Sequence, residues 1–204
     1  MSGPTIVLWR HGQTDFNATG RLQGQSDIEL NETGLRQAVA TAPHIARLGP
    51  TRIISSTLQR AMRTAEELGG VTGLQVEPDD RLRERSFGRW EGLTQEEIKD
   101  GWPEAFRAWR QGEEPQGIGA DTRQAVGERV AASLQESAAQ LDDDGVLVAV
   151  AHGAAITLGL THLLELDPES WFGLSGLDNC AWALVGPNPG RRPPWRLTGH
   201  NLTR

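Results

Sequence analysis

Basic side chains follow three of the apolar runs in this sequence. Such side chains are rarely buried in a protein core, so a functional role is a reasonable alternative. Guanidinium groups match phosphate oxygens with pairs of parallel hydrogen bonds, and a neutral imidazole can serve as a nucleophile or a proton carrier. Two arginines and two histidines close together would therefore form a pocket for a phosphoryl group. The side chains concerned are Arg10 and His11 after the first run, Arg60 after the second and His152 after the last.

Short apolar runs alternate with segments of helical periodicity along the chain, which is the pattern of a parallel sheet covered by helices on both faces. We therefore predict an α/β fold, a three-layer αβα sandwich with a mainly parallel sheet. Ligands on such sheets gather beyond the carboxyl ends of the strands, so the basic side chains should meet there. The expected strands are 5–9, 52–56, 74–76, 146–151, 181–185 and 195–198, with one of the last two a candidate antiparallel strand.

The segments between these runs predict helices and loops. Residues 15–31 have the composition of a polar loop. In the helix that follows, Pro43 should cause a kink or an interruption, and Gly69-Gly70 should end the next helix. The expected helices are 33–48, 58–68, 96–111 in one or two pieces broken by Gly101 and Pro103, 121–141, and one beginning after Gly153.

Length, charge and cysteine content narrow the class of protein. A chain of 204 residues without a dividing linker fits one domain, 1–204. The single Cys180 fits a reducing cytoplasm, and no apolar run approaches the ~20 residues of a membrane span. Residues 1–4 lead straight into the first strand, so we expect no secretory signal and a cytoplasmic location. The net charge of −7 argues against nucleic-acid binding but not against a small anionic substrate. Association as a homodimer is left open.

Other chemistries have less support. The two histidines could ligate a metal, but no HExxH motif or carboxylate at ligand spacing accompanies them, so we expect no metal site. The chain has no P-loop, and residues 173–176 miss the GxSxG pattern of a nucleophilic serine. Glu84 could supply a proton to a leaving group, although many other carboxylates are available. Cys180 is expected to be a buried apolar residue, and the expected structural histidines are His44, His162 and His200.

Four motifs resemble those of the histidine phosphatase superfamily, which has the phosphoglycerate mutase-like fold. They occur in order and together are specific. Two departures are Ala154, where the family often has a second glycine, and residues 119–122, near the place of a G-E-S triplet in many members. The motifs are R-H-G-x-T-x-x-N at 10–17, S-S-x-L-x-R-A-x-x-T-A at 55–65, R-E followed by F-G-x-W-E-G at 83–92, and A-H-G at 151–153.

The resemblance implies roles for individual residues. His11 would be the nucleophile and become a phosphohistidine, while Glu84 would protonate the leaving oxygen and then activate water. Arg10, Arg60 and His152 would hold the phosphoryl oxygens without a metal or another cofactor. The further substrate-binding residues that the resemblance implies are Asn17, Gln23, Gly24 and Gly153.

The F-G-x-W-E-G form resembles the phosphatase branch of the superfamily. The implied substrate is a small phosphorylated acid or sugar such as glucosyl-3-phosphoglycerate. Alternatives are a broad-specificity or alpha-ribazole phosphatase and a cofactor-dependent phosphoglycerate mutase. A phosphate-binding protein without catalysis is the alternative from another class, and it would bind a ligand without turning it over.

Residues 94–120 would form a lid over the active site. Trp102, Phe106 and Trp109 in this segment could stack on a sugar, but they could equally form the small core of the lid itself. Four arginines could pair with a carboxylate of the substrate: Arg107 and Arg110 in the segment, and Arg21 and Arg63 near the phosphate motifs.

Overall fold

Five strands running in one direction and a single strand running against them form the central sheet. In the computed structural model, which describes residues 3–204, the strand order is β3-β2-β4-β1-β5-β6. The strand β5 is antiparallel to both of its neighbours, so the prediction of a mainly parallel sheet is confirmed. The strands are β1 (Thr5–Arg10), β2 (Arg52–Ser55), β3 (Val76–Pro78), β4 (Val146–Ala151), β5 (Trp182–Pro187) and β6 (Trp195–Leu202).

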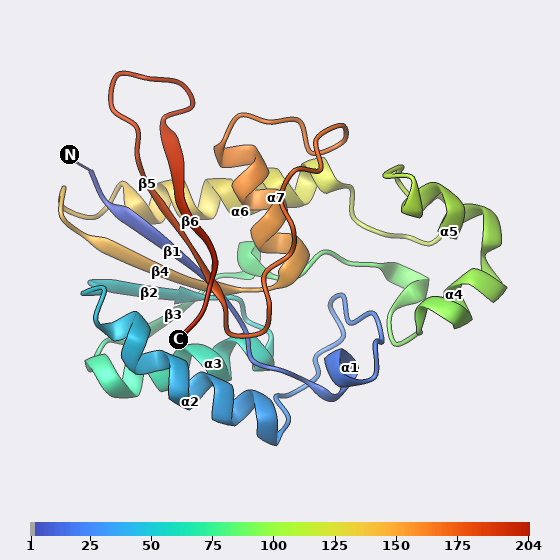
Figure 1. Cartoon of the computed structure of the whole chain (residues 1–204), viewed down its shortest axis with the longest axis horizontal. Helices are drawn as coiled ribbons and strands as arrows, with labels where there is room; N and C mark the ends of the chain where they lie inside the picture. Colours follow the sequence, from blue (N-terminus) through green and yellow to red (C-terminus); the bar gives the residue numbers. More distant parts are fainter. Residues whose placement is uncertain (1–2) are drawn as a thin grey trace.

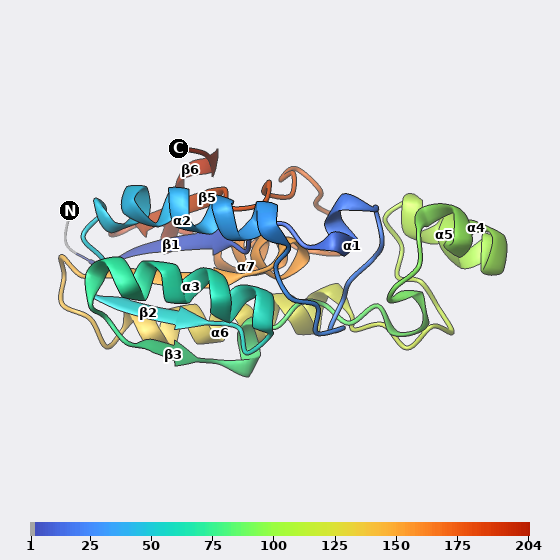
Figure 2. The same cartoon turned by 90° about the horizontal axis from the view of Figure 1, so that it is seen from below.

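Helices cover both faces of the sheet, as Figures 1 and 2 show. Alternate side chains of β1 point to opposite faces: Val7 and Trp9 belong to one buried cluster, Ile6 and Leu8 to the other. Burial on both sides explains why the central strands are apolar without alternation. The helices on the first face are α2 (Glu32–Ala46) and α3 (Gln59–Thr72), and those on the second are α6 (Arg123–Ala138) and α7 (Gly153–Leu163).

Three local predictions are corrected by the structure. The helix α2 runs uninterrupted through Pro43. The side chain of Pro43 is exposed, so the backbone hydrogen bond that proline cannot donate is missing on the solvent-facing side of the helix. The helix α3 continues through Gly69-Gly70 and ends at Gly73, whose φ of 76° suits glycine and whose N–H donates to the Gly69 carbonyl. The loop 15–31 begins with a one-turn helix, α1 (Asp15–Ala18), which is closed by a capping box from Thr14.

The segment 94–120 projects from one end of the sandwich, as the views in Figures 1 and 2 agree. It contains α4 (Gln95–Gly101) and α5 (Pro103–Arg110), separated at Trp102 as predicted. A third cluster of apolar side chains, centred on the buried Trp90, fills the space beneath these helices. The ring of Trp109 meets Trp90 edge-on at 5.7 Å, and Trp102 and Phe106 pack against the same cluster. Packing therefore accounts for much of the aromatic content of the segment.

Two short 3-10 helices, η1 (Asp80–Leu82) and η2 (Gly88–Trp90), shape the connection between β3 and α4. Within residues 3–204, no helix is both long and apolar enough to cross a bilayer. Residues 1–2, on which the expectation of no secretory signal depends in part, lie outside the described residues.

Candidate active site

Three basic side chains meet at the carboxyl ends of β1, β2 and β4, which are neighbours in the sheet. His11 follows β1, His152 is the N-cap of α7 directly after β4, and Arg60 lies in the first turn of α3. All three are buried, and the two imidazole rings lie 5.1 Å apart between their centroids. The sheet order therefore brings together residues that are up to 141 positions apart in the sequence.

His11 is held in one orientation and in its neutral form. Its Nδ1 lies 2.6 Å from the carbonyl oxygen of Gly12, which can only accept, so Nδ1 carries the proton and Nε2 keeps its lone pair. Burial lowers the pKa of His11 well below its usual 6.5, and the charges of Arg60 and Arg10 lower the pKa further. A neutral ring with a free Nε2 is the nucleophilic form of histidine.

Close contact between two glycines fixes the loop that carries His11. A Cβ atom on Gly12 would lie 2.5 Å from the carbonyl oxygen of Gly34 in α2. In return, a Cβ atom on Gly34 would lie 2.0 Å from the carbonyl oxygen of Gln13. The loop after β1 therefore rests directly on the backbone of α2, and neither glycine leaves room for a side chain.

Arg60 connects His152 with the loop that contains Gly24 and Ser26. Its Nη1 and Nη2 donate to the carbonyl oxygens of Ser26 and Gly24, each at 2.8 Å, and its Nε donates to Nδ1 of His152 at 3.2 Å. Burial lowers the pKa of Arg60 to about 10, against the influence of nearby carboxylates, so the group stays charged at neutral pH. The pKa of His152 is lowered by burial and then by Arg60, so that ring is neutral as well.

Arg10 has a donor that no protein group uses. Its Nη1 donates to the carbonyl oxygen of Leu177, while its Nε is buried and has no hydrogen-bond partner among the described residues. Burial lowers the pKa of Arg10, and the carboxylate of Glu84 raises it again. A buried N–H without a partner costs free energy unless a bound anion accepts from it.

The carboxylate of Glu84 sits at the N-terminus of α7. Its Oε1 accepts from the backbone N–H of Ala155 at 2.8 Å, and its Oε2 accepts from that of Ala154 at 3.2 Å. The side chain of Arg129 donates to the carbonyl oxygen of Glu84 at 3.0 Å and so fixes its backbone. The alanine at 154, where the family often has glycine, still binds Glu84, because only its backbone N–H takes part in this contact.

The four additional substrate-binding residues of the sequence analysis lie around this cluster. Asn17 Oδ1 accepts from Asn179 at 3.2 Å, and Gln23 is buried with its Oε1 accepting from Thr14 at 2.8 Å. Gly24 has a φ of 53°, and its carbonyl binds Arg60. These contacts are within the protein, and contact of Asn17, Gln23, Gly24 or Gly153 with a substrate stays a prediction.

Several supporting residues were missed by sequence reasoning. Asn179 Nδ2 donates to the carbonyl oxygen of His11 at 3.1 Å, and Ser56 Oγ lies 2.7 Å from Nε2 of His152. Glu91 accepts from both the 25–26 loop and the 86–87 segment. Its five hydrogen-bond donors are the backbone N–H groups of Gln25, Ser26 and Phe87 and the hydroxyls of Ser26 and Ser86. The only signal for Glu91 was its place in the F-G-x-W-E-G motif.

Two arginines suggested for substrate binding are engaged elsewhere. Arg21 forms an ion pair with Glu97 at 2.9 Å and also donates to the carbonyl oxygen of Gly92. Arg63 pairs with Glu66 and Glu67 along α3, on the exposed side of that helix. Neither guanidinium is directed at the histidine cluster, which corrects that suggestion.

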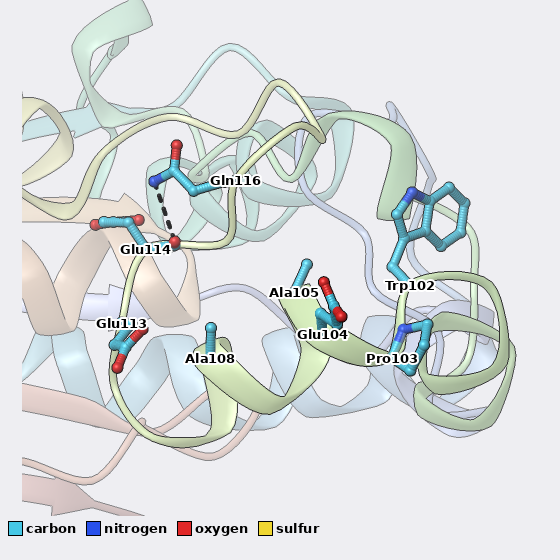
Figure 3. A pocket seen from close by; sticks show the side chains of 8 residues that line it. All are labelled: Trp102, Pro103, Glu104, Ala105, Ala108, Glu113, Glu114 and Gln116. Atoms are coloured by element: carbon cyan, nitrogen blue, oxygen red, sulfur yellow. Dashed lines mark hydrogen bonds between the residues drawn. The ribbon is translucent and has the colours of Figure 1, made fainter.

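Two of the cavities beside the projecting segment bear on the site. One, of about 510 Å³, lies between α5 and the returning chain 113–116; Figure 3 shows Trp102 on one side and the carboxylates of Glu113 and Glu114 on the other. Its acidic wall makes it a poor place for a phosphorylated ligand. The other, of about 280 Å³, includes Gly153 in its wall and so adjoins the histidine cluster. Residues 3–204 contain no group of three side chains suited to hold a metal ion.

Comparison with known proteins identifies relatives along almost the whole chain. The sequence profile of the histidine phosphatase superfamily (branch 1) matches residues 6–203. The glucosyl-3-phosphoglycerate phosphatase of Mycobacterium tuberculosis is 41% identical over 193 residues, 91% of this chain and 86% of that protein. Phosphoserine phosphatase 1 of Hydrogenobacter thermophilus is 32% identical over 183 residues, 88% of this chain and 85% of that protein.

A solved structure agrees with these relatives. The mycobacterial glucosyl-3-phosphoglycerate phosphatase in complex with VO3 superposes with a TM-score of 0.88 at 39% identity, covering 98% of this chain and 99% of that one. The αβα sandwich, with two histidines set among arginines at its strand ends, defines an enzyme of the phosphoglycerate mutase-like fold. The chain belongs to the histidine phosphatase superfamily, and it is a phosphatase of that superfamily.

Proposed function

We propose that the chain hydrolyses phosphate monoesters through a phosphohistidine formed at Nε2 of His11. The observation that carries this proposal is the hydrogen bond from Nδ1 of His11 to the Gly12 carbonyl, which leaves the Nε2 lone pair free in a buried, neutral ring. The other imidazole of the cluster, His152, has both ring nitrogens in hydrogen bonds, with Arg60 and with Ser56. Covalent catalysis of this kind divides a difficult displacement into two easier ones.

In the first step the Nε2 lone pair bonds to phosphorus, and the bond from phosphorus to the ester oxygen breaks. The carboxyl of Glu84 gives its proton to the departing oxygen. In the second step the Glu84 carboxylate takes a proton from water, the water oxygen bonds to phosphorus, and the phosphorus–nitrogen bond breaks. Inorganic phosphate leaves, and both His11 and Glu84 return to their starting forms.

The charge on the transferred group would be stabilised by protein donors alone. The unpaired Nε–H of Arg10 and the guanidinium of Arg60 support this assignment. His152 would join them only if its Nε2–H turned from Ser56 toward a phosphoryl oxygen. Activity should therefore survive exhaustive chelation, and vanadate should inhibit as an analogue of the pentacoordinate state. A strict need for a divalent ion would contradict this assignment.

For the substrate we propose glucosyl-3-phosphoglycerate, supported by relatives of that name at 41% and 39% identity. Phosphoglycerate mutase is the second candidate, because probable mutases are 34% identical over 200 residues. Within the proposal, residues 94–120 act as a lid of the single domain 1–204. A cytoplasmic location and association as a homodimer also stay proposals.

A panel of phosphate esters tests this function. The enzyme should release inorganic phosphate from glucosyl-3-phosphoglycerate with a higher kcat/KM than from 3-phosphoglycerate, phosphoserine or alpha-ribazole phosphate. Conversion of 3-phosphoglycerate into 2-phosphoglycerate without phosphate release would favour the mutase instead. Stoichiometric binding without turnover of any ester would mean that the site only binds phosphate.

A further inference from the structure

The cavity of about 280 Å³ opens beside the first turn of α7, directly next to the phosphoryl site. Gly153 forms part of its wall. A Cβ atom on Gly153 would lie 3.7 Å from Cζ of Arg10 and 3.9 Å from Oε2 of Glu84. The cavity therefore adjoins Arg10 and Glu84 across Gly153, beside the place proposed for the phosphoryl group.

Among residues 3–204, two arginines are the only charged residues in the wall of this cavity. They are Arg85, after Glu84, and Arg123, the first residue of α6. Their side chains are 3% and 9% exposed. The rest of the wall is apolar, small or hydroxyl-bearing, and it includes the aromatic rings of Trp109, Trp171 and Phe172. No carboxylate lines the cavity.

The two guanidinium groups share one carboxylate behind the wall. Glu114 Oε2 accepts from Nη2 of Arg85, and its Oε1 lies 3.5 Å from Nη1 of Arg123. Two backbone carbonyls complete their contacts: Arg85 Nε donates to that of Asp121 at 2.8 Å, and Arg123 Nη2 to that of Glu113 at 3.3 Å. The carboxylate of Asp121 lies 3.8 Å from Arg129 and also raises the pKa of Arg85. Burial lowers the pKa of Arg85, Glu114 raises it, and the neighbouring Arg123 lowers it again. Two guanidinium groups thus share one closely paired carboxylate, so the cavity wall carries more positive than negative charge.

We propose that Arg85 and Arg123 bind a carboxylate carried by the leaving group, while the aromatic rings contact its apolar or sugar part. The proposal rests on the proposed function, since it takes the phosphoryl group to lie at His11. A carboxylate supplies the missing negative charge and matches the planar guanidinium fork. Phe172 lies over Arg123, with 5.4 Å from Cζ to the ring centroid, and helps to hold that side chain in place.

Binding measurements on a His11→Ala protein test the proposal independently of turnover. The ligands are 3-phosphoglycerate and glycerol 3-phosphate, which differ by the carboxylate, and the readout is the ratio of their dissociation constants by calorimetry. The carboxylated ester should bind about 10–100-fold more tightly, the usual value of a hydrogen bond to a charged group. Adding Arg123→Gln should remove most of this preference. Arg36→Gln, the same change on an exposed arginine of α2 far from the cavity wall, should leave it intact.

Leu174 offers a second variant that does not depend on removing a buried arginine. It lies in the cavity wall and is partly exposed. Leu174→Glu should place a carboxylate near the two arginines and abolish the preference, whereas Leu174→Gln should keep it. Equal dissociation constants for the two esters, or an equal weakening of both by Arg123→Gln and Leu174→Glu, would overturn the proposal. Selective binding in a protein whose wild type turns over no ester would instead contradict the proposed function and leave the carboxylate site standing.

Discussion

The Nε–H of Arg60 donates to Nδ1 of His152 over 3.2 Å. Because a guanidinium cannot accept, Nδ1 of His152 holds its lone pair, and the ring proton lies on Nε2, 2.7 Å from the Ser56 hydroxyl. A second proton on this ring would break the bond to Arg60 and add a charge beside it. The site is therefore built around two neutral imidazoles, His152 and His11.

Stability should fall as the solution is acidified below about pH 6.5. Folding holds the pKa of His11 and of His152 well below 6.5, so below that pH the unfolded chain binds protons that the folded chain does not. Each ring then removes up to about 1.4 kcal/mol from the free energy of unfolding per pH unit, down to its own folded pKa. Urea unfolding between pH 5 and 8 measures this slope, and His152→Gln should reduce it. A flat profile over that range would contradict the neutral assignment.

His11→Ala should lose nearly all turnover and still fold, because both ring nitrogens of the other imidazole, His152, are already engaged in hydrogen bonds. Wild-type enzyme quenched during turnover should carry an acid-labile, base-stable phosphate, detectable by mass spectrometry on the peptide that contains His11. The variant should carry none. Phosphate release by the variant at a rate near that of wild type would contradict a covalent mechanism through His11.

Glu84→Gln should slow hydrolysis of alkyl phosphates by about 10²–10⁴, the usual value of general acid–base catalysis. The amide retains an oxygen for the N–H groups of α7 but cannot give a proton to the leaving oxygen. Nitrophenyl phosphate has a leaving group that needs no proton, so burst measurements with this ester should show a smaller loss in the first step. The same loss on every ester would assign Glu84 a structural role.

Glu91→Gln should lower the free energy of unfolding by about 1–3 kcal/mol, because an amide NH2 would face N–H or O–H donors that now bind a carboxylate oxygen. The 25–26 loop that Glu91 holds also adjoins the carbonyls that bind Arg60. A rise in KM for the phosphate ester should therefore accompany the loss of stability. Glu29→Gln, on an exposed side chain nearby in sequence, is the control and should change neither quantity.

Gly34→Ala and Gly70→Ala should shift stability in opposite directions although both lie in helices. Alanine at 34 would place its Cβ 2.0 Å from the Gln13 carbonyl and should cost about 1–3 kcal/mol through overpacking. Alanine at 70 would meet nothing within 4 Å, so it should stabilise α3 by about 0.5–1 kcal/mol. Thermal unfolding of the pair measures both shifts, and a harmless Gly34→Ala would contradict the close contact of the loop with α2.

Local pattern was enough to predict the central strands, because burial on both faces demands unbroken apolar runs such as 146–151. It was less exact at the sheet edges, where the strand expected at 74–76 is Val76–Pro78 and the one expected at 195–198 extends to Leu202. It was not enough for helix ends. Gly69-Gly70 looked like a stop, yet packing carries α3 on to Gly73, where a left-handed residue can satisfy the last carbonyls. Pro43 was tolerated because its missing hydrogen bond faces solvent. Tertiary contacts override such local signals, because a single glycine or proline changes the free energy of a helix by only a few kcal/mol at most.

The sequence by itself determined the αβα class and the identity of Arg10, His11, Arg60 and His152 as a group, because residues at the carboxyl ends of neighbouring strands must converge. Only the tertiary structure decided two further features: which ring nitrogen of His11 carries the proton, and that the carboxylate of Glu84 binds the N-terminus of α7. The excess of positive charge in the cavity wall was likewise not predictable from the sequence. Hydrogen-bond direction and burial depend on atoms brought together from distant parts of the chain, and no spacing along the sequence encodes them.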